Sequence, residues 1–177
     1  MIFRDQQGNL HLFELKDVPR GEQARQRWQA IRSLRNLLAH GDPDVVAAML
    51  RSRSSRVEPR YVHPSFLRKL SDDQRLVISG ARAAARIGDL AADERLEAYI
   101  KPSDLPVIQY EYGLQQPADP ARANVILRVV EENLAWSARE APLLFVAADL
   151  RERDDARARE ASDELFRRLH SALELAE

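Results

Sequence analysis

The sequence predicts an α/β (α+β) protein: a small mixed sheet with helices, preceded by an N-terminal β-hairpin and helix. Three observations lead to this class. The stretch Leu76–Leu150 alternates between strand-like and helix-like patterns, and within it Leu96–Ile100 shows the period of two that is typical of a half-buried strand. Two other stretches, Gly21–His40 and Ala156–Leu175, carry apolar stripes at helical spacing.

The central stretch divides into five elements. The predicted order is a strand at Leu76–Gly80, a helix at Ala81–Ile87, a strand at Leu96–Ile100, a helix at Asp104–Tyr112 closed by Gly113, and a strand at Asn124–Val130. Alanine favours the first helix, and β-branched residues favour the last strand. A final apolar run, Leu143–Ala148, is too short for its periodicity to distinguish a strand from a helix.

The two ends of the chain add a hairpin and further helices. Ile2–Asp5 and Leu10–Leu15 are expected to pair around a turn that contains glycine and asparagine. A helix at Gly21–His40 should end at the following glycine and proline, and a short helix should begin near Asp44. The C-terminal helix, Ala156–Leu175, is expected to cover the sheet; docking of a partner is the alternative for its apolar stripe.

The segment Arg51–Arg56 marks the predicted domain boundary because it is short, basic and rich in serine. Residues 1–56 then form an N-terminal hairpin-helix appendage, and residues 57–177 form the main domain. Arginine and serine suit contacts with phosphate, so Arg51, Arg53 and Arg56 are candidates for nucleic-acid contact, with a solvated linker as the alternative.

Composition excludes several classes of protein. The 177 residues contain no cysteine, which rules out disulfides, a thiolate nucleophile and a cysteine zinc site. The N-terminus lacks a basic and apolar signal region, and no apolar run reaches the length of a membrane span, so a cytoplasmic protein without a membrane partner is expected. The net charge of −1 does not by itself indicate nucleic acid.

A strand that ends in Ser79-Gly80 and enters an alanine-rich helix can bind an anion, because glycine permits the turn and the helix offers its N-terminal amides. An acidic strand about fifteen residues later is the arrangement of a nucleotidyltransferase core. Ser79, Gly80, Arg82 and Glu97 would line a nucleotide-like pocket here. The two acids available, Glu94 and Glu97, are three residues apart and would lie on opposite faces of a strand. No metal or cofactor is therefore expected.

A family resemblance rests on short blocks in a fixed order. They are Val77–Ala84, Glu97–Ile100, Tyr112–Leu114, Ala123–Val130, Ala141–Pro142 and Ala148–Leu150, followed by Arg157 and Leu165. These blocks, within roughly residues 76–170, resemble the C-terminal domain of AbiEi-like antitoxins and related helix-turn-helix regulators. The resemblance implies a nucleotidyltransferase-like fold that has lost its catalytic carboxylates. It also implies a non-catalytic bacterial protein of a toxin–antitoxin or phage-defence system, with a cognate toxin as partner and with DNA or RNA contact and self-association left open.

An alternative function rests on Arg35, Asn36 and His40, which resemble the Arg-Asn-x-x-x-His signature of HEPN ribonucleases. In that family the arginine binds a phosphate and the histidine accepts a proton from a ribose hydroxyl, without a metal. The structural alternative is a basic last turn of a helix, where arginine and histidine complement the helix dipole. The sequence therefore leaves a metal-independent ribonuclease as the competing hypothesis.

Overall fold

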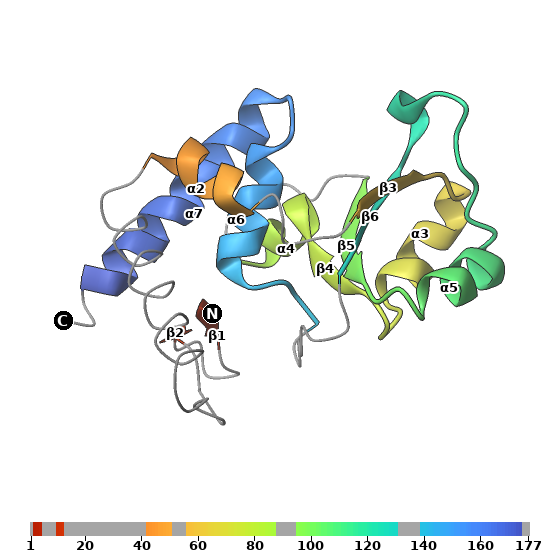
Figure 1. Cartoon of the computed structure of the whole chain (residues 1–177), viewed down its shortest axis with the longest axis horizontal. Helices are drawn as coiled ribbons and strands as arrows, with labels where there is room; N and C mark the ends of the chain where they lie inside the picture. Colours follow the sequence, from red (N-terminus) through yellow and green to blue (C-terminus); the bar gives the residue numbers. More distant parts are fainter. Residues whose placement is uncertain are drawn as a thin grey trace, which may run out of the picture. The chain divides into compact units, whose positions relative to one another are not determined.

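The computed structural model describes residues 2–4, 10–12, 42–50, 56–87, 95–130 and 139–174. These residues form a mixed α/β protein with a four-stranded mixed sheet, a separate two-stranded hairpin and six α-helices (Figure 1), which confirms the predicted class. The chain divides into two compact units. Unit 1 comprises Met1–Leu50 and Pro142–Glu177, and unit 2 comprises Arg51–Ala141. The predicted helix at Gly21–His40 lies outside the described residues.

Unit 2 is built on the sheet, whose strand order is β3-β6-β5-β4. Its elements in chain order are β3 (Arg56–Arg60), α3 (Pro64–Ser71), β4 (Val77–Ser79), α4 (Gly80–Ile87), β5 (Leu96–Ile100), α5 (Leu105–Tyr112), a 3-10 turn η2 (Pro120–Arg122) and β6 (Val125–Val129). The central strands β5 and β6 are parallel, and each pairs antiparallel with an outer strand, β4 and β3 respectively. A parallel pair needs a long crossover, which the segment containing α5 provides.

The register divides the sheet into an apolar face and a polar face. Side chains of one face come from alternate residues, and on the apolar face these are Leu96, Ala98 and Ile100 with Val125, Leu127 and Val129, all of them buried. Helices α3 and α5 lie on one side of the sheet and α4 on the other (Figure 1). Leu67, Leu70, Leu105 and Ile108, from α3 and α5, complete the core of unit 2. Both faces of β5 are buried, so the strand expected at Leu96–Ile100 is present but is not half-buried, because a central strand is covered on both sides.

Helix α5 ends as the sequence predicts. Gly113 adopts a left-handed conformation, with φ of 61°, and closes the helix through hydrogen bonds to the carbonyls of its last turn. The strand β3, in contrast, begins inside the segment predicted to be a linker, because Arg56–Arg60 pairs along its whole length with β6.

The described residues of unit 1 form the hairpin and the helices α2, α6 and α7. Strands β1 (Ile2–Arg4) and β2 (Leu10–Leu12) pair antiparallel, as predicted. Helix α2 (Pro43–Met49) begins at Asp42, whose carboxylate accepts a hydrogen bond from the Asp44 N–H at 2.8 Å. The ambiguous apolar run Leu143–Ala148 is helical, as part of α6 (Leu143–Arg151).

The C-terminal helix α7 (Ala156–Glu174) packs on α6, which corrects the expectation that it covers the sheet. Ala147 of α6 is completely buried, and its carbonyl accepts a hydrogen bond from the Ser162 hydroxyl of α7 at 2.8 Å. The buried stripe of α7 is Ala158, Ser162, Leu165, Phe166 and Leu169. The small side chains at the contact allow the two helices to approach closely.

The two compact units do not follow the order of the chain. One division falls at Leu50–Arg51, and Pro142–Glu177 belongs to the same unit as the N-terminal segment, while the unit that holds the sheet lies between them in the sequence. Within unit 1, Arg151 at the end of α6 contributes to this grouping: its guanidinium lies 2.6 Å from Asp44 of α2 and also pairs with Asp163 of α7. No helix in the described ranges is long and apolar enough to cross a membrane.

Asn124 joins β6 to the segment that follows β3. Its side chain accepts a hydrogen bond from the Val62 N–H at 2.9 Å and donates one to the Val62 carbonyl at 2.7 Å, so it replaces a missing strand partner. Asn124→Ala should destabilise the protein by about 1–3 kcal/mol, because both backbone groups of the buried Val62 lose their partner. Urea unfolding followed by circular dichroism measures this loss.

Gln115→Ala is the matched control for this prediction. Gln115 holds the neighbouring Tyr61 through backbone bonds only, at 2.8 and 2.9 Å, and its side chain is exposed. Truncation of that side chain should therefore change the free energy of unfolding by less than about 0.5 kcal/mol. Equal losses in the two variants would show that the Asn124 side chain is not the support described.

Candidate functional site

The polar face of the sheet brings four functional side chains together on three adjacent strands. Ser79 of β4 lies opposite Glu97 of β5, and Tyr99 of β5 lies beside Arg128 of β6. Glu97 and Tyr99 are two residues apart, so they project from the same face. The register therefore gathers a hydroxyl, a carboxylate, a phenol and a guanidinium. We call Ser79, Glu97, Tyr99 and Arg128 the polar cluster.

The polar cluster is buried. The exposed fractions are 0% for Ser79, 3% for Glu97, 1% for Tyr99 and 5% for Arg128, and each of the four interacts with other groups of the protein. Charged side chains are rarely buried to this extent unless they are paired or hydrogen-bonded. The carboxyl group of Glu97 and the guanidinium of Arg128 lie on the same buried face, where their opposite charges offset each other.

Gly80 forms the turn between β4 and α4 and lies against the polar cluster. Its φ of 60° belongs to the left-handed region, which glycine adopts without strain. A Cβ added at Gly80 would lie 2.8 Å from Cδ of Glu97 and 3.0 Å from its Oε2. The Glu97 side chain thus packs directly against Gly80, the first residue of α4.

The structure brings three of the four residues of the predicted nucleotide-like pocket together: Ser79, Gly80 and Glu97. The fourth, Arg82, is on α4 and donates from Nε to the carbonyl of Arg95 at 3.3 Å, which ties the helix to the chain just before β5. Sequence reasoning did not select Tyr99 or Arg128 as site residues. The signal for Arg128 was present, since it is the one charged residue in an otherwise apolar strand.

The other predicted site residues are described only in part. Arg56 begins β3, where its Nε lies 2.7 Å from Oε1 of Glu58, and its side chain is 58% exposed. Glu58 also pairs with Arg60, so one carboxylate is shared by two guanidinium groups. The remaining candidates, Arg51 and Arg53 for nucleic acid, Arg35, Asn36 and His40 for ribonuclease chemistry, and Glu94, lie outside the described residues.

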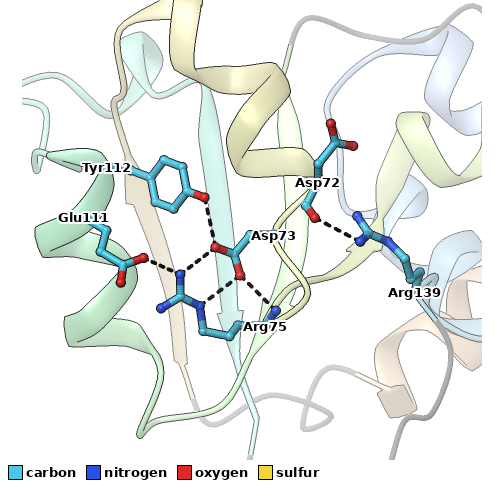
Figure 2. A network of polar contacts seen from close by, with 6 residues as sticks. All are labelled: Asp72, Asp73, Arg75, Glu111, Tyr112 and Arg139. Carbon is cyan, nitrogen blue, oxygen red and sulfur yellow. Dashed lines mark hydrogen bonds and ion pairs between the residues drawn. The ribbon is translucent and has the colours of Figure 1, made fainter.

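A second polar network lies where the turn after α3 meets the end of α5 (Figure 2). Asp73 accepts hydrogen bonds from Nε and Nη2 of Arg75, at 2.9 and 2.6 Å, and from the hydroxyl of Tyr112 at 2.9 Å. Arg75 also pairs with Glu111. At the other side of the turn, Arg139 donates to the carbonyls of Ser71 and Asp72, each at 2.9 Å. The network holds the turn in place on both sides.

The pKa values in this network follow from its hydrogen bonds. The Arg75 guanidinium, and after it the Tyr112 hydroxyl, lowers the pKa of Asp73 from 3.8 to about 2. Arg75 also lowers the pKa of Glu111. Burial is the main reason that the pKa of Tyr112 is raised, and its hydrogen bond to Asp73 adds to this effect. Near neutral pH, Asp73 and Glu111 therefore stay charged and Tyr112 stays neutral. The role of this network is to stabilise the fold.

The described residues contain no group of three or more His, Asp or Glu side chains placed to hold a metal ion. Comparisons of the chain with protein families, with curated proteins and with solved structures found no match.

The contact between Gly80 and Glu97 can be tested with a pair of alanine variants. Gly113 has nearly the same φ, 61°, but no atom lies within 4 Å of the position of an added Cβ. Gly113→Ala should therefore cost about 1–2 kcal/mol from backbone strain alone. Gly80→Ala should cost a further 1–3 kcal/mol or so, because Glu97 must also move. Thermal and urea unfolding of the two variants measure the difference; equal losses would contradict the described packing of Glu97.

The network around Asp73 predicts a loss of stability in acid. Because the folded-state pKa of Asp73 is depressed, its contribution is fully present above pH 4 or so and is lost as the pH falls towards about 2. The side chain is 7% exposed, so the contribution is about 2 kcal/mol. Between pH 5 and pH 2, wild type should lose about this much more stability than Asp73→Asn in urea titrations.

Tyr112→Phe is the graded control, since it removes one of the hydrogen bonds that stabilise the Asp73 carboxylate. Its acid dependence should lie between those of wild type and Asp73→Asn. If all three proteins lose stability in parallel, Asp73 is not the group that titrates.

Proposed function

We propose that this chain is a non-catalytic binding protein of a bacterial toxin–antitoxin or phage-defence system, of the antitoxin-like or transcription-regulatory type. It acts in the cytoplasm, its main partner is a cognate toxin protein, and it contacts DNA or RNA through the arginine-rich segment that precedes β3. This function is the one implied by the resemblance to AbiEi-like antitoxins, and it requires no metal and no nucleotide cofactor.

The observation that carries the proposal is the position of Glu97 against Gly80. A nucleotidyltransferase needs the strand-to-helix turn to be open, because the phosphates of the nucleotide bind at the helix N-terminus. Here the side chain of Glu97 lies against this turn, with its Cδ 2.8 Å from the position that a Cβ on Gly80 would take. A phosphate bound at this turn would therefore lie close to a carboxyl group of like charge.

The burial of the polar cluster supports the same proposal. Ser79 and Glu97, which would have to face the nucleotide, are 0% and 3% exposed. A catalytic carboxylate that binds magnesium needs a water-accessible position for the ion and its remaining water ligands. The cluster is better suited to hold the three strands in register than to turn over a substrate.

Growth of bacteria that express the protein from an inducible promoter tests the proposal. Wild type and the double variant Arg35→Ala/His40→Ala should both be harmless, because the proposal assigns no ribonuclease activity to these residues. Co-expression with its cognate toxin should restore growth that the toxin alone inhibits. Colony counts and growth curves provide the measurement.

Two outcomes would overturn the proposal. Toxicity of wild type that disappears in the double variant, together with RNA cleavage in EDTA, would make the chain a metal-independent ribonuclease. Magnesium-dependent incorporation of a labelled nucleoside triphosphate that disappears in Glu97→Ala would make it a transferase. Incorporation that persists in Glu97→Ala would point to a contaminating enzyme and would leave the proposal in place.

A further inference from the structure

The two edges of the sheet in unit 2 differ in how their backbone groups are used. At β4, Ile78 donates to the carbonyl of Arg139 and accepts from the N–H of Ala141, each at 2.8 Å, so this edge is covered. At β3, in the part of the chain that the structure describes, the backbone partner on the outer side is Gln115, which pairs with Tyr61 beyond the end of the strand. The outer edge of Arg56–Arg60 has no strand beside it in these residues. An edge strand of this kind is a template for pairing with another chain.

The backbone groups that face outward can be assigned. Tyr61 exchanges two hydrogen bonds with Gln115, at 2.8 and 2.9 Å, so its backbone groups point away from β6. The carbonyl of Arg60 accepts from the N–H of Asn124 at 3.1 Å, so that residue points toward β6. Because the direction alternates along a strand, Val57 and Pro59 point outward like Tyr61. Proline fits this position, since its missing N–H would face solvent and not β6.

Two copies of β3 can pair antiparallel through these outward residues, and charge selects the register. With the twofold axis at Val57, Arg56 lies opposite Glu58 of the second copy on both sides of the axis. With the axis at Glu58, the two Glu58 carboxylates face each other and Arg56 faces Arg60, so like charges are adjacent. With the axis at Pro59, the central pair has no N–H to donate. Only the register centred on Val57 makes all central pairs favourable.

We propose that the protein forms a symmetric dimer in which β3 pairs antiparallel with β3 of a second copy, centred on Val57. The two Val57 residues exchange N–H···O bonds, and the two Arg56–Glu58 pairs flank them at the closely spaced, non-hydrogen-bonded positions. The two four-stranded sheets then form one continuous sheet. A self-complementary patch of this kind is what a twofold interface requires. The inference does not depend on the proposed function.

The exposure of the residues agrees with this partner. The side chain of Val57 is 47% exposed although it belongs to a strand, and Arg56 is 58% exposed at the side chain. Glu58 is only 14% exposed and already binds Arg56 and Arg60 of its own chain. The carboxylate therefore has a fixed position at which it meets the guanidinium of the second copy. Pro59 limits the pairing to this short region, which prevents extension of the strand into larger aggregates.

Disulfide trapping in the full-length protein tests the proposal directly, because the chain contains no cysteine. In the proposed register the Cα atoms of the two Val57 residues are about 5.5 Å apart, within the range that a disulfide spans. Val57→Cys should form a covalent dimer under mild oxidation. Val45→Cys is the matched control, since Val45 on α2 is 48% exposed but is not at the proposed interface. Cross-linking of Val57→Cys no greater than that of Val45→Cys would overturn the proposal.

Charge substitutions provide a test that does not depend on a disulfide. Arg56→Glu and Glu58→Arg should each weaken self-association about tenfold in sedimentation equilibrium, because each places like charges opposite each other twice. An equimolar mixture of the two variants should recover the wild-type affinity, since every pair across the interface is then Arg with Glu. Circular dichroism confirms that both variants are folded. A mixture that associates no better than the separate variants, or a wild type that remains monomeric at 100 µM or so, would contradict the proposed interface.

Discussion

The parallel pairing of β5 with β6 is the constraint on which the rest of unit 2 depends. Both strands are buried, and their register determines which side chains share a face. Because parallel strands cannot be joined by a tight turn, α5 must cross over the sheet, and the covering of the apolar face follows from that connection. The same register places Tyr99 beside Arg128 on the opposite face, so the core and the polar cluster are consequences of one pairing.

The turn at Gly80 is packed against the neighbouring strand of its own sheet. Because glycine has no Cβ, the Glu97 side chain can approach the turn to a distance that no other residue at this position would allow. Glu97 is thus part of the packing between β4, α4 and β5.

The two edges of the sheet in unit 2 differ in whether they can pair with a second copy of the chain. One edge is closed by Arg139–Ala141, and Arg139 also holds the turn after α3 in the network of Figure 2. The other edge is restricted by Pro59 and by the bridge from Tyr61 to Gln115. What remains of this edge is the short, charged segment around Val57, which precedes Pro59 in β3. Such a segment is too small for uncontrolled aggregation but long enough to specify one register.

Part of the candidate site could be predicted from sequence because its signals are local, and the rest depends on how the strands pair. Ser79 and Gly80 stand out because a strand-to-helix turn has a local signature, and Glu97 stands out as an acid in the next strand. Arg128 and Tyr99 were missed, because only the pairing of β6 beside β5 makes them neighbours of Glu97. Residues that are distant in sequence become one cluster through register, and register is a property of the assembled sheet.

The sequence by itself determined the elements whose signals are local: the strand β5, the helix α5 closed by Gly113, and the short helix α2 near Asp44. Tertiary structure alone decided that Leu143–Arg151 is a helix and that α7 packs on it. A short apolar run has no periodicity that excludes a strand, and an apolar stripe does not specify what covers it. The conformation of a short run and the partner of an apolar stripe depend on which surfaces meet in the folded protein, and the local sequence pattern does not specify those surfaces.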